Sequence, residues 1–282
     1  MGKFSTTLAK GEQQDSTTQK NDSDWLSPEN VENRDKETAD RPHPPTTPAS
    51  SQWDSRLFKA INEDISIPEI FKVLRSRILH PQNGEKAIKT IMVTSAVPKE
   101  GKSFITANLG ISLAQGMDQH SLLVDCDLRR PSLAGLLGMQ RATGLVDYLR
   151  DNTPLATLIN KTIVNKLSLI ASGKPPLNPA ELLSSAKMKE LTNELSQRYE
   201  DRIIIFDTPP ILVAAETGVL ARLVDRVILV VREGTSRKHE IQKTIDTIGK
   251  EKIMGIVYND QTSNIFDKSY SKKYNYYLHD AK

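Results

Sequence analysis

The ten residues at positions 95–104, Ser-Ala-Val-Pro-Lys-Glu-Gly-Lys-Ser-Phe, constrain the fold more than any other stretch of this chain. An apolar run at 91–93 precedes them, and a helix-like segment at 105–115 follows. A strand, a tight loop with Gly-Lys-Ser and a helix form the arrangement of a phosphate-binding loop. Backbone N–H groups and the helix start hold a polyphosphate there. The stretch therefore predicts a nucleotide site.

The loop residues have distinct expected roles. Lys102 is expected to reach the β- and γ-phosphates, and the Ser103 hydroxyl is expected to ligate Mg²⁺. A left-handed backbone at Lys99 would cost about 1–2 kcal/mol. The alternative is an ordinary turn that contains Gly-Lys-Ser by chance. The residues expected to contact the nucleotide are Pro98, Lys99, Glu100, Gly101, Lys102, Ser103 and Phe104.

Strand-like and helix-like segments alternate after the loop. The expected strands are at 90–95, 121–125, 167–171, 202–207, 226–231 and 253–258. The expected helices are at 105–115, 132–137, 145–150, 179–199, 215–223 and 238–248. This alternation predicts an α/β fold, a P-loop NTPase-like parallel sheet with helices on both faces. Ligands bind such sheets beyond the carboxyl ends of the strands.

Three aspartates lie at such strand ends. Asp207 ends an apolar run, which suits a second Mg²⁺ partner beside a phosphate loop. Asp125 and Asp127 alternate across another strand end, so one could steady Mg²⁺ through water while the other accepts a proton from a hydroxyl nucleophile. Arg129 and Arg130 could offset charge on phosphate or carboxylate. The alternatives are a turn-capping role for Asp207 and a surface ion-pair network for the others.

Composition divides the chain into three parts. Residues 1–60 are rich in polar residues and proline and predict a disordered tail or linker. Residues 61–263 carry the alternating pattern and predict the folded domain, and residues 264–282 predict a flexible tail. No apolar run approaches about 18 residues, so no membrane span is expected. The net charge of +3 does not by itself indicate a nucleic-acid partner.

Tyrosine is concentrated at the C-terminus, where lysines accompany it. The cluster consists of Tyr270, Tyr274, Tyr276 and Tyr277. Three interpretations fit a basic, aromatic and flexible segment: a nucleic-acid tail, an interface patch, or a set of phosphate acceptors. Phosphorylation would add roughly −1.5 to −2 charge at each hydroxyl and would turn a basic tail acidic.

A charged face is expected on a helix that begins near Pro68. Glu69, Lys72 and Arg75 are three residues apart and are therefore neighbours along that helix. They could form an ordinary solvated face or a protein–protein contact.

Taken together, these motifs resemble the bacterial tyrosine kinases, autokinases associated with capsular and exopolysaccharide export. Residues 95–103 resemble the phosphate loop of that family, 123–131 its second Walker-type motif, and 204–210 its Walker B motif. The charged helix resembles the element through which members form ring-like homo-oligomers, and the tyrosine cluster resembles their autophosphorylation tail. The family usually has glycine where Lys99 stands and arginine where Lys72 stands.

The resemblance implies an ATP- and Mg²⁺-dependent protein-tyrosine autokinase that phosphorylates its tail in trans and regulates polysaccharide polymerisation and export. It implies that Ser103, Asp127 and Asp207 hold Mg²⁺, that Asp125 is the catalytic base, and that Lys102 binds the transferred phosphate. The implied partners are a membrane-embedded activator and a tyrosine phosphatase, with no nucleic acid. The implied location is cytoplasmic, at the inner face of the plasma membrane through a partner.

Two rival functions share parts of this pattern. A partition or division-site ATPase has the same fold and Walker motifs, but it carries an early signature lysine where this chain has Val97. A nucleotide-gated scaffold without kinase activity is the second rival.

Overall fold

The computed structural model describes residues 53–57, 69–81, 87–139, 143–198 and 201–260. The chain divides into two units, and the first, Met1–Pro44, lies outside the described residues. The remainder of the predicted N-terminal tail, at 45–52 and 58–60, and the predicted C-terminal tail at 264–282 also lie outside them. Everything that follows concerns the second unit.

Helices and strands alternate along this unit, as the sequence predicts. The helices are α2 (Glu69–Leu79), α3 (Lys102–Ala114), α4 (Leu133–Leu136), α5 (Leu145–Asp151), α6 (Leu155–Leu158), α7 (Pro179–Leu183), α8 (Ala186–Arg198), α9 (Ala215–Leu223), α10 (Lys238–Ile248) and the 3-10 turn η3 (Lys250–Lys252). The strands are β1 (Thr90–Ser95), β2 (His120–Asp125), β3 (Asn160–Lys161), β4 (Leu167–Ile170), β5 (Arg202–Asp207), β6 (Arg226–Arg232) and β7 (Ile253–Asn259).

The strands form one sheet. Within the described ranges its order is β3-β4-β2-β5-β1-β6-β7, and every pairing is parallel except that of the two-residue strand β3 with β4. The predicted α/β fold with a parallel sheet is therefore confirmed. Strand β5 lies between β2 and β1, so the carboxyl ends of these three strands are neighbours.

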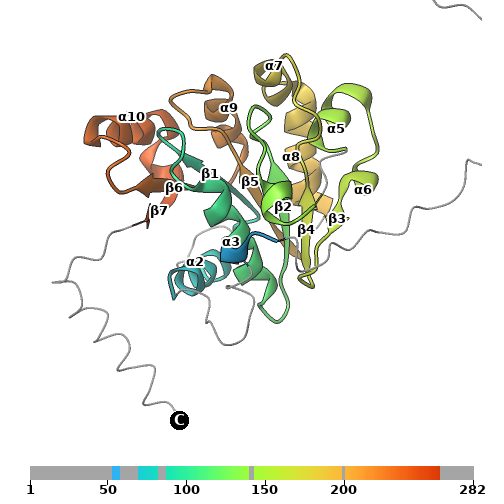
Figure 1. Cartoon of the computed structure of the whole chain (residues 1–282), viewed down its shortest axis with the longest axis horizontal. Coiled ribbons are helices and arrows are strands. Elements are labelled where there is room, and N and C mark those ends of the chain that lie inside the picture. Colours follow the sequence, from blue (N-terminus) through green and yellow to red (C-terminus); the bar gives the residue numbers. More distant parts are fainter. Residues whose placement is uncertain (1–52, 58–68, 82–86, 140–142, 199–200, 261–282) are drawn as a thin grey trace, which may run out of the picture. The chain divides into compact units, whose positions relative to one another are not determined.

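Helices cover both faces of the sheet (Figure 1). One apolar cluster packs α2, α3 and α4 against the sheet, and the other packs α5 to α10 against the opposite face. In β5, Ile205 belongs to the first cluster and Phe206 to the second, because successive side chains of a strand point to opposite faces. Burial on both faces explains the uninterrupted apolar runs by which the central strands could be predicted.

One predicted helix is two helices. The sequence pattern predicts a helix at 179–199, but α7 ends at Leu183 and α8 begins at Ala186. The Ser185 hydroxyl accepts a hydrogen bond from the Met188 N–H at 3.1 Å and donates one to the Leu182 carbonyl at 2.7 Å. Ser185 therefore caps the start of α8. Because serine favours this capping position, the predicted helix is divided into α7 and α8 here.

A short segment before the predicted domain boundary packs into the core. Trp53 and Leu57 are buried in the cluster beneath α3, although the boundary at residue 61 places them in the tail. The Asp54 N–H donates to the Leu136 carbonyl at 3.0 Å, which ties the segment to the end of α4. We call residues 53–57 the anchor segment. Among the described helices, none is long and apolar enough to cross a membrane.

Candidate active site

The predicted phosphate loop joins the end of β1 to the start of α3. Lys99 has φ 67° and Gly101 has φ 93°, so two of its residues are left-handed. Lys99 therefore has the left-handed conformation whose cost is given above. Glycine is needed at position 101 for a second reason, because an added Cβ would lie 2.1 Å from Nδ2 of Asn259.

The start of α3 offers donors to an anion. Gly101 is the N-cap residue and has no side chain to occupy the free N–H groups of the first turn. Lys102 follows and is buried, with 7 % of its surface exposed. A cation and free amides at a helix start are the features that bind phosphate. The start of α3 therefore has the donors and the positive charge that a bound polyphosphate would need.

Asp207 lies beside this loop at the end of β5 and is fully buried. Its Oδ1 accepts a hydrogen bond from the Thr106 hydroxyl on α3 at 3.3 Å, whereas its Oδ2 has no hydrogen-bond partner in the described protein. Burial raises the pKa of the Asp207 carboxyl group to about 7, while the nearby Ser103 hydroxyl and the positive charge of Lys102 act to lower it. A buried carboxylate oxygen without a donor is unfavourable, and a cation in the cleft would satisfy it.

Asp125 lies next to Asp207, as its register partner across β2 and β5. Its Oδ2 accepts the N–H groups of Ser132 and Leu133, both at 3.1 Å, and its Oδ1 accepts that of Asp127 at 3.2 Å. Burial, together with the Asp207 carboxylate, raises the pKa of Asp125 well above its usual value. Asp125 thus shapes the turn before α4 and lies behind the cleft surface.

Asp127, two residues further, lines the cleft itself. Its Oδ1 accepts the Arg130 N–H at 3.0 Å, and burial raises the pKa of its carboxyl group. Among the described residues, no three His, Cys, Asp or Glu side chains form a preformed metal site. A magnesium ion held by Ser103, Asp127 and Asp207 would therefore need water or phosphate oxygens to complete its coordination.

Lys102, Ser103 and Asp127 border a cleft of about 560 Å³, whereas the buried Asp125 and Asp207 are not among its lining residues. Arg129 belongs to its wall, and its Nε and Nη2 contact Oε1 of the buried Glu216 at 3.1 and 2.9 Å. This ion pair holds the Arg129 guanidinium at the wall of the cleft. Its partner is the buried Glu216 and not Asp125 or Asp127, as a surface ion-pair network would require. The cleft is lined by Arg56, Pro98, Lys99, Gly101, Lys102, Ser103, Phe104, Asp127, Arg129, Arg130, Ser132, Leu136, Pro209, Pro210, Val213 and Ala214.

Arg56 of the anchor segment is a cleft residue that the sequence did not predict, as are Ser132, Leu136, Val213 and Ala214. Its guanidinium lies 5.3 Å from the ring centroid of Phe104, at the first turn of α3, and it forms a forked ion pair with Asp54. Only the apolar pair Trp53 and Leu57, four residues apart, could have indicated that this part of the polar tail packs against the domain.

The predicted contact helix, α2, lies apart from the cleft lining. Glu69 is its first residue, and Lys72 is partly buried. Nη1 of Arg75 donates to the Ser112 carbonyl of α3 at 2.8 Å, so this residue also holds α2 in place. Ile70 and Val73 are exposed. The four predicted phosphate-acceptor tyrosines lie outside the described residues.

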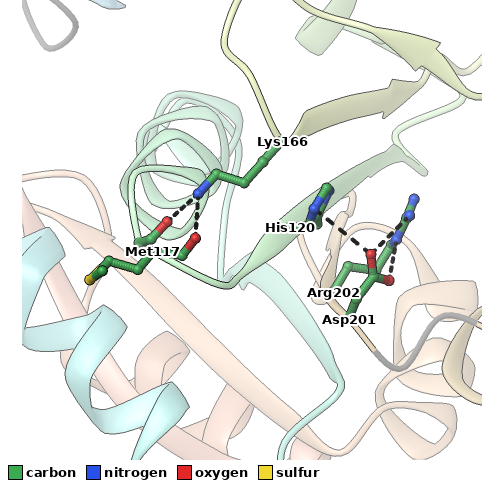
Figure 2. A network of polar contacts seen from close by, with 6 residues as sticks. Met117, His120, Lys166, Asp201 and Arg202 are labelled. Carbon is green, nitrogen blue, oxygen red and sulfur yellow. Dashed lines mark hydrogen bonds and ion pairs between the residues drawn. The ribbon is translucent and has the colours of Figure 1, made fainter.

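A second polar cluster lies at the opposite edge of the sheet (Figure 2). His120 and Arg202 begin β2 and β5, and both lie close to Asp201 there. The Lys166 ammonium donates to the carbonyls of Gly116 and Met117, just after α3. These contacts lie where the strands begin, whereas the cleft lies where the strands end.

Bacterial tyrosine kinases are among both the curated relatives and the solved structures that match the chain. No family model matches the chain. The tyrosine-protein kinase YwqD of Bacillus subtilis is 36% identical over 177 residues, covering 62% of this chain and 73% of YwqD. The putative tyrosine-protein kinase CapB of Staphylococcus aureus is 32% identical over 213 residues, covering 75% and 90%. The kinase domain of Escherichia coli tyrosine kinase ETK superposes with a TM-score of 0.66 at 28% identity, covering 73% of this chain and 80% of that domain.

Proposed function

The chain belongs to the family of bacterial tyrosine kinases, and from this premise we propose that it transfers the γ-phosphoryl group of ATP to tyrosines of its own tail. Membership assigns the enzyme class, a protein-tyrosine kinase. The nucleotide, the metal and the acceptors form the proposal. The observation that carries it is the unpartnered Oδ2 of Asp207, which lies beside a phosphate loop and calls for a cation at that position.

The proposed binding roles follow the geometry of the cleft. Lys102 and the first amides of α3 bind the phosphates, with the other loop residues shaping the backbone around them. Ser103, Asp127 and Asp207 hold Mg²⁺, which when bound neutralises charge on the transferred phosphoryl group. Arg129, held by Glu216, adds a fixed positive charge at the same cleft.

In the proposed transfer, a tyrosine oxygen attacks the γ-phosphorus, the bond to the β,γ-bridging oxygen breaks, and ADP leaves. The phenol proton passes to a carboxylate, and we propose Asp125, which ends β2 directly beside Asp207. Most of the acceleration comes from positioning and charge neutralisation.

The proposed acceptors are Tyr270, Tyr274, Tyr276 and Tyr277, supplied by a neighbouring copy. A ring-like homo-oligomer would bring the tail of one copy to the cleft of the next, with Glu69, Lys72 and Arg75 of α2 in the contact. The exposed Ile70 and Val73 on the same helix support this surface, because they add apolar area between the charges.

The wider role proposed is regulation of capsule or exopolysaccharide polymerisation and export. It requires a membrane-embedded activator that brings the kinase to the inner face of the plasma membrane, and a tyrosine phosphatase that resets the tail. The proposal includes no nucleic-acid partner. All of these rest on the family alone, since no described contact bears on them.

One experiment separates the kinase from its rivals. The purified chain is incubated with Mg²⁺ and ATP labelled at the γ-phosphate, and both protein-bound label and free phosphate are measured. Label on the tail tyrosines supports the kinase. Release of free phosphate without protein label would support the ATPase, and binding of ATP with neither product would support the scaffold.

A further inference from the structure

Glu100 is an acidic residue buried inside the loop that is proposed to bind an anion. Its exposed fraction is 0 %. Oε2 accepts the Val97 N–H at 3.1 Å, within the loop itself. Oε1 accepts the hydroxyl of Ser236, which lies between β6 and α10, at 2.5 Å and the N–H of Arg232, the last residue of β6, at 3.3 Å. The carboxylate therefore links the phosphate loop to residues more than a hundred positions away in the sequence.

A second link joins the loop backbone to the end of β7. Nδ2 of Asn259 donates to the Glu100 carbonyl at 2.9 Å, and it occupies the space beside Gly101 that a Cβ would fill. Arg232 adds a longer contact, from Nη1 to the Lys99 carbonyl at 3.5 Å. Its Nε also contacts Oδ2 of Asp260 at 2.8 Å. We call Glu100, Arg232 and Asn259 the loop clamp.

The clamp spans the strained part of the loop. Lys99 and Gly101, the two left-handed residues, flank Glu100 on either side. A non-glycine residue in this conformation persists only where surrounding contacts over-determine it. Burying a carboxylate near a polyphosphate site is also unfavourable unless donors satisfy it. The left-handed backbone and the buried carboxylate are both unfavourable, and both occur at residues 99–101. The hydrogen bonds accepted by the Glu100 side chain offset both costs.

We propose that Glu100 is a positioning residue, which holds the phosphate loop in its nucleotide-binding conformation by tying it to the ends of β6 and β7. The inference rests on the proposed function only in taking a nucleotide as the ligand of the loop. It adds a role for the Glu100 side chain, which is not among the residues that line the cleft and acts through the backbone of Lys99 and Gly101. By linkage, nucleotide binding stabilises the clamp to the same extent that the clamp favours binding.

The test measures Mg-ADP binding to the full chain by calorimetry, with the melting temperature of each variant recorded without nucleotide. Glu100→Ala is expected to weaken ADP binding at least about tenfold, because several hydrogen bonds to a charged group are lost. Asn259→Ala, which removes only the backbone contact, is expected to weaken it about threefold. Glu100→Gln keeps the side-chain shape and one acceptor and should restore part of the loss.

The matched control is Thr192→Ala on α8. Thr192 is a buried residue whose hydroxyl donates to the Met188 carbonyl, away from the cleft. It should lower the melting temperature while leaving the ADP dissociation constant within about twofold, since a lost hydrogen bond costs stability wherever it lies. If Glu100 had only a structural role, Glu100→Ala would likewise lower the melting temperature and leave the ADP dissociation constant unchanged.

Folded Glu100→Ala with unchanged ADP affinity would overturn the inference. If that variant does not fold, Asn259→Ala decides, and wild-type affinity in it would overturn the inference equally. The readout is independent of phosphoryl transfer. A chain that binds ADP through the clamp yet labels no tyrosine would refute the proposed kinase reaction and leave the positioning role intact.

Discussion

Replacing Lys99 with glycine should stabilise the nucleotide-free protein. Lys99 has φ 67° on the exposed surface of the phosphate loop. No hydrogen bond of its ammonium is found among the described residues, so the substitution removes backbone strain at little cost in contacts. Its carbonyl, which faces Arg232, is kept.

The magnitude follows from two opposing effects. A left-handed conformation costs a side-chain-bearing residue about 1–2 kcal/mol relative to glycine. Glycine gains about 0.4–1 kcal/mol of additional conformational freedom in the unfolded chain, which acts in the opposite direction. The two ranges differ by about 0–1.6 kcal/mol, and the midpoint, a gain of about 0.8 kcal/mol in the free energy of unfolding, raises the melting temperature of a domain of this size by roughly 2–3 °C.

Thermal unfolding followed by circular dichroism measures the shift, and Lys166→Gly is the matched control. Lys166 also has φ 67°, but its ammonium donates to the carbonyls of Gly116 and Met117 (Figure 2). Glycine there relieves the same strain and loses those hydrogen bonds, so no stabilisation is expected. A melting temperature of Lys99→Gly at or below that of the wild type would refute the strain argument.

Three further predictions concern transfer and assembly. Lys102→Met should abolish tail labelling because the phosphates lose their buried cation, and undiminished labelling measured with radioactive ATP would remove the loop from the mechanism. Asp125→Asn should keep nucleotide binding but slow transfer by about 10²–10⁴-fold in a single-turnover assay, whereas collapse of binding would assign Asp125 to the turn alone. Combined Glu69→Ala and Arg75→Ala should lower the mass of the oligomer measured by light scattering. The control Arg77→Ala, at an exposed residue of α2, should leave that mass unchanged. An unchanged mass in the double variant would show that this face of α2 is an ordinary solvated surface.

The part of the fold that could be predicted is the part whose signal is local. The apolar run of β5 indicates a strand that is buried on both faces, and the sequence Gly101-Lys102-Ser103 indicates the turn into α3. The left-handed Lys99 could be anticipated because it occupies a loop position that favours glycine. Parallel strands then bring Asp125 and Asp207 to one edge, since their ends follow from the strand boundaries.

The parts that could not be predicted depend on contacts between distant residues. The sequence predicts that Glu100 contacts the nucleotide, but Glu100 is buried and is not among the residues that line the cleft. Its partners Ser236 and Asn259 lie 136 and 159 positions away, so no local pattern indicates its contacts. Arg56 stands in a polar segment that composition assigns to a tail, and only tertiary packing brings it to Phe104. Composition averages over many residues, so it does not resolve a packed segment as short as 53–57.

Transfer between two copies of the chain is the most direct test of the account. A Lys102→Met chain with an intact tail is mixed with a chain that has an intact loop and phenylalanine at positions 270, 274, 276 and 277. After incubation with Mg²⁺ and ATP, mass spectrometry measures phosphotyrosine on each chain. Transfer between copies would place phosphate on the tail of the Lys102→Met chain. A mixture in which that tail stays unmodified, while the wild-type chain labels itself, would contradict transfer between copies.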